Sequence, residues 1–387
     1  MFTGAYIDTA TSILEQYKGQ APFHLYLKSF FAVHKKFGSR DRKHITQLCY
    51  CWFRAGLALQ HLELKQQLVL SLVLCSEGES KLLEQLDAGL NQLAAKNLAE
   101  KSKLLEEQHG FQLQNLFPWN DELSDAIEKS AFQQSLLIQP DLFLRLRPGK
   151  EQAVINMLQH HQIPFQKQSD NCLALANSAK VDAVLKLDAD AVIQDLNSQK
   201  VLDLVTEHGL LKNSRVWDCC AASGGKSLLL LDTVPDVQVT VSDVREGILH
   251  NLHGRFKKAG LKNYQWFIAD ATIDAPPKQQ KFDLIICDAP CSGAGTWSRT
   301  PEQLHLFDTE KIDRYAQLQK GIVCNVSNFL KPGGMLLYST CSVFKKENEA
   351  VVDYIIARCN LTFLKSAYYK GYNKKGDTLF AALFKAL

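Results

Sequence analysis

The sequence predicts an α/β protein, with a doubly wound sheet in its C-terminal half, preceded by a small α+β module and an all-helical N-terminal domain. From about residue 198, strand-like apolar segments alternate with helical ones. Residues 140–199 carry short elements in the order β-α-β-β-α-β, as in a ferredoxin-like unit. Before residue 125 the apolar residues follow helical spacing. A chain of 387 residues is long enough for two or three domains.

The N-terminal region has the pattern of a helical bundle. Apolar stripes run along residues 7–17 and 82–93, and residues 62–75 are apolar nearly all round, which predicts a central buried helix. Ser39 is placed to cap a helix whose first turns, SRDRKH, are rich in basic side chains. Cations oppose the helix dipole at that end, so contact with phosphate would explain them; the alternative is an ordinary solvated face.

The middle module is predicted from alternation and short helical runs. Arg145, Arg147 and Lys150 could form a basic patch on it. The predicted strands are residues 142–147, 163–168, 172–176 and 192–196, and the predicted helices are residues 151–160 and 179–187.

The C-terminal half is predicted to be one compact α/β domain. An amphipathic helix precedes Lys331 and is expected to end at Pro332-Gly333-Gly334. Strands are predicted at residues 215–220, 237–242, 264–269, 282–287, 335–340, 361–364 and 379–384.

Composition places few limits on function. A net charge of +3 permits a polyanionic partner without requiring one. The 11 cysteines are scattered without CxxC pairs, which favours free thiols in a reducing cytoplasm and predicts no metal site. The N-terminus lacks the pattern of a signal peptide, and the longest uncharged apolar run, residues 66–76, is shorter than the about 20 residues that span a bilayer. We therefore expect a cytoplasmic monomer with no membrane partner.

A glycine loop and three acids follow consecutive predicted strands. The segment DCCAASGGK ends in Gly224, Gly225 and Lys226, where the backbone could approach a ligand at a helix start. A P-loop would need glycine at position 220, which is cysteine. A carboxylate about 20 residues past a glycine turn can accept hydrogen bonds from ribose hydroxyls. The pattern predicts a nucleoside-containing cofactor, with the acids at Asp243, Asp270 and Asp288.

Two cysteines follow the ends of later strands. Cys291 lies in CDAPCSGAGT, and Cys341 lies in YSTCS at the same predicted sheet edge. Such thiols could form a metal site, a redox pair or a covalent catalyst. Nothing nearby in the sequence supplies further metal ligands, so a thiolate nucleophile is favoured. The residues by themselves leave open which thiol attacks.

The motifs DCCAASGGK, VSDV, IADAT, CDAPCSGAGT and YSTCS, in this order, resemble those of the Sun/Fmu (RsmB-like) family of S-adenosylmethionine-dependent RNA cytosine-C5 methyltransferases. The resemblance implies a Rossmann-like class I methyltransferase domain at residues 200–387. It also implies a ferredoxin-like pre-catalytic module at residues 131–199 and, on the segment SRDRKHITQLCYCWFR, a NusB-like RNA-binding domain at residues 1–130.

The resemblance also implies the reaction. Cys341 would attack C6 of a cytosine, C5 would accept the methyl group of S-adenosylmethionine, and Cys291 would assist release of the product. Asp288 would hydrogen-bond the base near N3, with Lys226 supporting the active site. The target base must be unstacked, so single-stranded or locally opened RNA, expected to be ribosomal RNA, is the partner. The implied cofactor-binding residues are Cys220, Ala221, Ala222, Ser223, Gly224, Gly225, Lys226, Asp243, Asp270 and Asp288.

The sequence departs from the family at two places and leaves two other functions open. Ser223 stands where the family usually has proline, and Ile248 occupies the region of a family arginine, so no cofactor-binding arginine is assigned. A DNA cytosine-C5 methyltransferase is one alternative, because its nucleophile follows proline as Cys291 does. A non-catalytic RNA-binding factor for ribosome assembly is the other.

Overall fold

The computed structural model describes residues 3–209, 212–234 and 236–387, and it divides into two compact units. The first consists of Met1–Asp121, Glu128–Gln139 and Trp297–Asp308. The second consists of Glu122–Ile127, Pro140–Thr296 and Thr309–Leu387. The chain therefore passes between the units several times, and the domain boundaries at residues 130 and 199 stay predictions.

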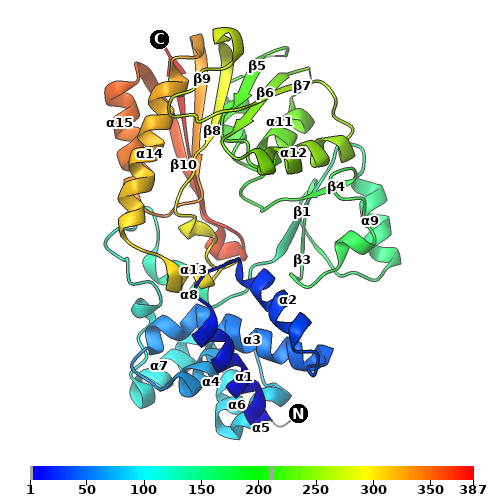
Figure 1. Ribbon diagram of the computed structural model, residues 1–387, viewed down its shortest axis with the longest axis vertical. Coiled ribbons are helices and arrows are strands. Elements are labelled where there is room, and N and C mark those ends of the chain that lie inside the picture. The colour runs from blue at the N-terminus through cyan, green and yellow to red at the C-terminus, as the bar shows by residue number, and fades with distance from the viewer. Residues whose placement is uncertain (1–2, 210–211, 235) are drawn as a thin grey trace. The chain divides into compact units, whose positions relative to one another are not determined.

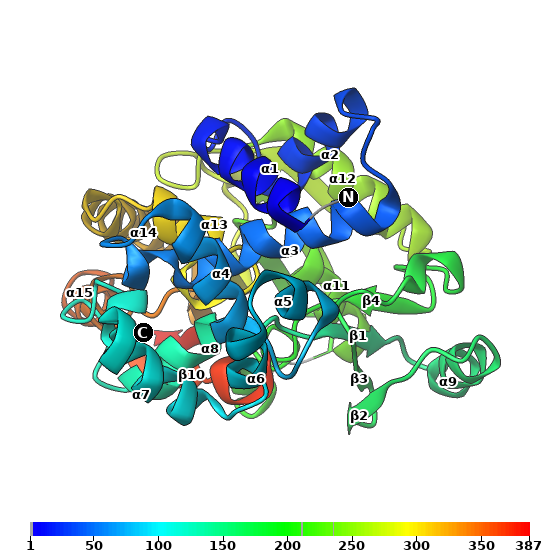
Figure 2. The same cartoon turned by 90° about the horizontal axis from the view of Figure 1, so that it is seen from below.

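The first unit is built from helices around one apolar core, as predicted. The helix α4 is buried nearly all round, which confirms the central buried helix; its polar Gln67 is satisfied by the Trp52 indole, at 2.7 Å. Helices α3 and α4 lie side by side (Figures 1 and 2). The helices are α1 (Thr3–Gln16), α2 (Phe23–Val33), α3 (Ser39–Ala55), α4 (Leu64–Cys75), α5 (Lys81–Leu86), α6 (Ala88–Ala94), α7 (Leu98–His109), α8 (Lys129–Leu136) and α13 (Glu302–Leu306).

The start of α3 differs from the prediction in one residue. Gly38, and not Ser39, occupies the N-cap, and the Gly38 N–H donates to Asp41 Oδ2 at 2.9 Å. Asp41 also matches the positive end of the helix dipole. Arg40 and Lys43 in the same turns are exposed, as a phosphate-binding role would require.

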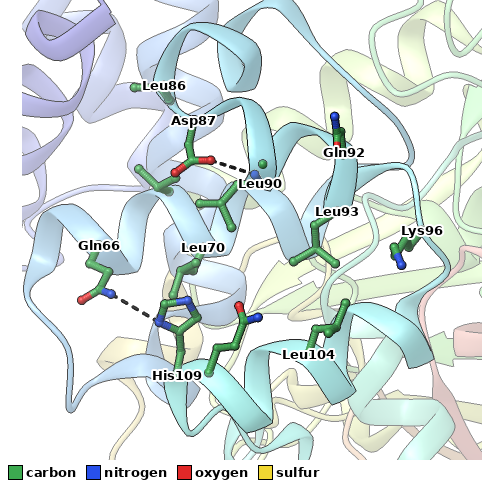
Figure 3. Close-up of a pocket in the computed structure, with 13 residues that line it drawn as sticks. Gln66, Leu70, Leu86, Asp87, Leu90, Gln92, Leu93, Lys96, Leu104 and His109 are labelled. Carbon is green, nitrogen blue, oxygen red and sulfur yellow. Dashed lines mark hydrogen bonds between the residues drawn. The ribbon is translucent and has the colours of Figure 1, made fainter.

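A cavity of about 670 Å³ lies among α4, α6 and α7 of this unit (Figure 3). Leu70, Leu90 and Leu93 form apolar walls, and Lys96 and His109 line the cavity at opposite ends in this view (Figure 3). Its shape is held by local hydrogen bonds, including the one from Leu90 N–H to Asp87 Oδ1 at 2.9 Å. None of the catalytic or cofactor-binding residues predicted from the sequence lines this cavity.

The second unit contains a small antiparallel sheet in the order β2-β3-β1-β4, with α9 packed against it (Figure 2). This is the strand order of a ferredoxin-like unit. The predicted helix at residues 179–187 is wrong, because only a 3₁₀ turn forms at Val181–Ala183 before the backbone turns at Asp188, with φ of 67°. The elements are β1 (Leu142–Leu146), α9 (Glu151–His160), β2 (Gln166–Ser169), β3 (Cys172–Leu175) and β4 (Ala191–Ile193).

The expected basic patch on β1 is also wrong for two of its three residues. Arg145 and Arg147 point to the same side of the strand, as residues two apart must. Both pair with Asp232, at 2.5 Å through Arg145 Nη1 and 2.7 Å through Arg147 Nη2. The Arg145 side chain is 2% exposed, so it is not accessible to a partner. Its ion pair instead joins the small sheet to Asp232 of the neighbouring α/β part.

A seven-stranded sheet forms the rest of the second unit, in the order β10-β11-β9-β8-β5-β6-β7. Helices α11 and α12 cover one face, and α14 and α15 cover the other (Figure 1). The strands are β5 (Arg215–Asp218), β6 (Gln238–Asp243), β7 (Tyr264–Ile268), β8 (Phe282–Asp288), β9 (Leu330–Thr340), β10 (Leu361–Tyr369) and β11 (Leu379–Ala386); the helices are α10 (Asp203–Thr206), α11 (Gly225–Thr233), α12 (Glu246–Lys258), α14 (Glu310–Ser327) and α15 (Glu349–Arg358).

The strand β11 is antiparallel to both of its neighbours. One detail of this sheet corrects the prediction. The helix α14 ends at Ser327, and Pro332-Gly333-Gly334 lies inside β9, where the pairing with β8 is irregular. Gly333 has a φ of 73°, so the glycine permits this bulge.

The strand order reverses between β5 and β8, with β6 and β7 on one side and β9 on the other. In open α/β sheets, ligands bind beyond the carboxyl ends of strands at such a switch point. The segments after Asp218 and Asp288 both begin there. Among the described residues, no helix is long and apolar enough to cross a bilayer.

Candidate active site

The loop after β5 folds tightly onto the neighbouring strands. Ala221 N–H donates to Ser242 O at 2.9 Å, and Ala222 N–H donates to Asp243 Oδ2 at 3.0 Å. Gly224 has a φ of 79°, and a Cβ there would lie 2.7 Å from the Phe256 ring. Glycine is therefore required at position 224 on both counts.

Ser223, which replaces the usual proline, is held by an arginine of α12. Arg255 Nη1 donates to Ser223 O and to Ser223 Oγ, both at 3.0 Å, while its Nε pairs with Asp188 at 2.9 Å. Sequence reasoning missed Arg255, because its only local signal is a basic residue in the last turn of a helix.

The acids after β6 and β7 reach a common cavity. Asp243 is 5% exposed, and each of its carboxylate oxygens accepts two hydrogen bonds, from Ala222 N–H and from Arg245. Although burial opposes it, these bonds hold the pKa of Asp243 below its usual range. The hydroxyl and N–H of Thr272 lower the pKa of the exposed Asp270.

Lys226, which is buried, and Asp288, which is partly exposed, form an ion pair. Lys226 Nζ lies 2.6 Å from Asp288 Oδ2, and Ser339 Oγ donates to Asp288 Oδ1 at 2.9 Å. Burial lowers the pKa of Lys226, but the negative charges around it, of which that of Asp288 is the largest, together with the hydrogen bond to Asp288 outweigh burial, so the pKa is raised and the ammonium persists. The Asp288 carboxylate is thus fixed on both oxygens.

Cys291 and Cys341 are brought together at the carboxyl edge of the sheet. Their thiols hydrogen-bond, and this bond, burial and the nearby Asp288 raise the pKa of Cys341 well above that of a free thiol. Cys341 follows β9, and its carbonyl accepts from Gly295 N–H at 2.8 Å. A Cβ on Gly295 would lie 2.0 Å from Thr378 O, so no larger residue fits.

A buried carboxylate, Glu347, ties the two cysteine segments together. Its oxygens accept from Ser292 N–H at 2.9 Å and from Ser342 Oγ at 2.8 Å, and each serine directly follows one of the cysteines. Gln319 Nε2 also donates to it, at 3.0 Å. Burial raises the pKa of Glu347 despite these bonds. The sequence gives no signal for this role, since Glu347 lies in a charged segment.

Asp218, at the end of β5, is buried and accepts from Ser227 Oγ at 2.6 Å. Burial raises its pKa to about 7. Its second oxygen, Oδ1, makes no hydrogen bond among the described residues.

Two cavities meet at these residues. The acidic cavity, of about 480 Å³, is lined by Asp243, Asp270 and Cys291. The lysine cavity, of about 300 Å³, is lined by Asp218, Lys226 and Cys341, together with Ala221, Ser223 and Gly225. Cys220, Ala222 and Asp288 line both. The structure therefore gathers the predicted site residues around two adjoining cavities, with Gly224 shaping the loop between them.

The sheet order, the single antiparallel strand β11 and a glycine loop at the switch point define a Rossmann-like methyltransferase, a class whose cofactor is S-adenosylmethionine. The residues present fit that cofactor. The acidic cavity is of ligand size, its carboxylates could accept hydrogen bonds from ribose hydroxyls, and the loop backbone can approach a ligand because Gly224 lacks a Cβ.

The profile of the family described as 16S rRNA methyltransferase RsmB/F matches residues 209–378 of this chain. Ribosomal RNA small subunit methyltransferase B of Shewanella oneidensis is 33% identical over 191 residues, which are 49% of this chain and 44% of the relative. The chain thus spans about half the length of the curated relatives that it matches.

Solved structures share the fold. PH0851 aligns with a TM-score of 0.69 and 20% identity over 92% of this chain and 93% of its own. NSun6 from Pyrococcus horikoshii, solved with SFG, aligns with a TM-score of 0.54 and 17% identity over 64% of this chain and 91% of its own. At these identities the likeness supports the fold alone.

Proposed function

We propose that this protein transfers a methyl group from S-adenosylmethionine to C5 of a cytosine in RNA, through a covalent bond between Cys341 and C6 of the base. The observation that carries the proposal is the pair of hydrogen-bonded thiols beside the Lys226–Asp288 ion pair. S-adenosylmethionine is the class cofactor, and SFG, with which NSun6 was solved, is an analogue of it.

The chemistry explains why two thiols and a carboxylate are needed. Cytosine C5 is a poor nucleophile until a thiolate adds to C6, which moves electron density onto C5. The bound cofactor supplies the electrophilic methyl group. Afterwards the C5 proton leaves, the C5–C6 double bond re-forms, and the thiolate is expelled.

Each side chain has a place in this sequence. Cys341 attacks C6, and Cys291, in hydrogen-bond contact with it, exchanges a proton with it and helps release the product. As the thiolate adds to C6, N3 of the base takes up a proton, and the Asp288 carboxylate, aligned by Lys226 and Ser339, accepts a hydrogen bond from the base at that edge. Asp243, Asp270 and the loop from Cys220 to Gly225 hold the cofactor.

Substitution of the two thiols tests the assignment. We expect Cys341→Ala to abolish methylation, and Cys291→Ala to accumulate a covalent RNA adduct, visible on denaturing gels after incubation with RNA and cofactor. The matched control is Cys324→Ala on α14, whose thiol contacts Tyr354 and Cys359 and lines neither cavity. An adduct formed through Cys291 in the Cys341→Ala variant would reverse the two roles.

The activity should rise with pH. The pKa of Cys341 is raised, so at neutral pH the folded protein holds a thiol and only a small fraction is the attacking thiolate. Raising the pH increases that fraction, and single-turnover methylation should accelerate until the thiol is ionised. A rate independent of pH above neutrality would contradict attack by Cys341 as the slow step.

The proposed substrate is ribosomal RNA of the small subunit, bound in part by the helical unit, and we expect it to be met in the cytoplasm. The names of the family and of the curated relatives support ribosomal RNA, and the exposed Arg40 and Lys43 of α3 offer phosphate contacts. Bisulfite sequencing of ribosomal and transfer RNA, from cells with and without the protein, would identify the cytosine.

The two alternatives predict different outcomes. Pro290 precedes Cys291, as in DNA cytosine-C5 methyltransferases, so single-stranded DNA and RNA of the same sequence should be compared as methyl acceptors. A non-catalytic assembly factor would bind RNA without S-adenosylmethionine, and titration calorimetry with the cofactor would separate it from an enzyme.

A further inference from the structure

We propose that Cys219, Cys220 and Cys287 form a binding site for a thiophilic metal ion, of which zinc fits best. The sequence predicted no metal site, because the three cysteines are not spaced as one motif. The fold brings them together. Neither the methyl transfer nor the cofactor needs these three thiols as a group, so the inference is independent of the proposed function.

The distances suit a shared ion. The three sulfur atoms all lie within 4.8 Å of one another. Tetrahedral zinc, with Zn–S bonds of about 2.3 Å, separates its sulfur ligands by about 3.8 Å. Small rotations of the thiols therefore suffice to bring them onto one ion. Among the described residues, this is the group of three metal-ligating side chains that comes together.

The sheet fixes two of the three ligands before any ion binds. Asp218 pairs with Ile286 across the parallel strands β5 and β8, and Cys219 N–H then donates to Ile286 O at 3.0 Å. Cys219 and Cys287 are thus neighbours on adjoining strands, and Cys220 follows in the loop. A site built on strands is preorganised, because little backbone freedom is lost on binding.

The surroundings favour sulfur ligation and leave a way in. Cys219 and Cys287 are 1% and 0% exposed, in a core that includes Trp217 and Ile285. Soft thiolates in such a place select zinc or monovalent copper over hard cations. Cys220 is half-buried and lines both cavities, so an ion can enter there, and a water molecule can take the fourth position.

Charge decides between the two ions. Three thiolates leave a net charge of −1 on a divalent ion and −2 on a monovalent one. In a buried site beside Asp218 and Asp288, the smaller negative charge costs less, so zinc is favoured. Binding releases the thiol protons, and metal affinity should therefore rise with pH.

The test is zinc binding by the full chain. Metal is first removed with a chelator. The protein is then dialysed against a small molar excess of Zn²⁺, and bound zinc is measured by elemental mass spectrometry. We expect about one ion per chain, and at least tenfold weaker binding in Cys219→Ala and Cys287→Ala. Cd²⁺ as a probe should give a thiolate charge-transfer absorption that is lost in the same variants.

Other thiols provide matched controls. The sulfur atoms of Cys324 and Cys359 lie 3.3 Å apart, so the double variant Cys324→Ala/Cys359→Ala removes a close pair of thiols outside the active site, and it should keep the ion. The double variant Cys291→Ala/Cys341→Ala should also keep it. Loss of the ion in either double variant, with retention in Cys219→Ala and Cys287→Ala, would overturn the proposal.

A measurement on the unmodified chain covers the case in which a core variant does not fold. Alkylation of Cys220 by iodoacetamide, followed by peptide mass spectrometry, should slow at least tenfold when Zn²⁺ is present, while alkylation of Cys324 is unchanged. An unchanged rate at Cys220, or stoichiometric binding of Cu⁺ with none of Zn²⁺, would overturn the assignment to zinc.

Discussion

At the scale of single residues, the loop after β5 shows how one arginine side chain can hold a glycine-rich loop. Proline at position 223 would stiffen the backbone through its ring. Serine lacks that constraint, and Arg255 supplies a substitute by donating to both the carbonyl and the hydroxyl of Ser223. Arg255 is therefore a positioning residue for the proposed cofactor loop.

Removing this clamp should weaken the cofactor complex. We expect Arg255→Ala to raise the dissociation constant of S-adenosylmethionine about tenfold, since the lost charge-assisted hydrogen bonds contribute about 1–2 kcal/mol. Adding Ser223→Pro to that variant should restore most of the affinity, measured by calorimetry. Lys257→Ala, an exposed change on the same helix, is the control. Failure of the proline to rescue would show that Arg255 acts elsewhere.

Asp218 gives a prediction about stability and pH. Its pKa is raised to about 7 in the folded chain, against 3.8 when unfolded. Between these values the folded state holds the extra proton, so the free energy of unfolding falls as pH rises, by on the order of 1 kcal/mol per pH unit. Asp218→Asn should flatten this slope in urea unfolding between about pH 4 and 7, because an amide does not titrate. The amide oxygen can still accept the hydrogen bond from Ser227, so the fold should be kept.

At the scale of elements, the two cysteine segments are set by the turn that carries Glu347. Ser292, Ser342 and Gln319 all donate to its carboxylate, so three elements share one buried acceptor. The distance between Cys291 and Cys341 therefore depends on a residue that is outside both motifs.

Loss of this acceptor should reduce both stability and turnover. In Glu347→Ala, the Ser292 N–H and the Ser342 hydroxyl lose this acceptor, at about 1–3 kcal/mol each, while Gln319 keeps its bond to Pro290 O, so we expect a lower melting temperature and a fall in kcat of at least tenfold with little change in KM for the cofactor. Glu347→Gln keeps one acceptor oxygen and should be intermediate. Asp353→Ala, exposed on α15, controls for charge. A normal kcat in Glu347→Ala would contradict the proposed role of Glu347 in positioning the two cysteines.

The comparison of sequence and structure also belongs to this scale. The glycine loop, the acids at Asp243, Asp270 and Asp288, and the thiol of YSTCS could be predicted because each sits where a strand ends, and strand ends can be read from apolar runs. Arg255, Glu347 and the cysteine cluster could not, since their partners lie far away in the chain. The predicted second helix of the small module was wrong. Residues 179–187 have helical spacing, but they form only a short 3₁₀ turn in the connection between β3 and β4.

At the scale of the whole molecule, the chain crosses between its two units. The segment Trp297–Asp308, which directly follows the Cys291 loop, belongs to the helical unit. There Trp297, 1% exposed, packs against Phe117 and Trp119, with ring centroids 5.9 Å and 5.4 Å apart. The Cys291 loop is thus anchored at its far end by residues of the N-terminal half.

This interleaving predicts that the methyltransferase part depends on the helical part. A chain that starts at Pro140 would leave Trp297 and Leu306 without their apolar partners, so we expect it to aggregate or to melt at a lower temperature than the full chain. Scanning calorimetry and gel filtration would check this, with the Trp119→Phe full chain as a mild control. A stable, monomeric fragment would support independent domains.

The wall that Cys220, Ala222 and Asp288 share between the acidic and lysine cavities has a consequence for inhibitor design. A single compound with an adenosine-like group on one side and a pyrimidine-like group on the other could occupy both chambers, joined by a short tether past Asp288. Such a bisubstrate ligand would gain from effective concentration, because binding of one end holds the other near its chamber.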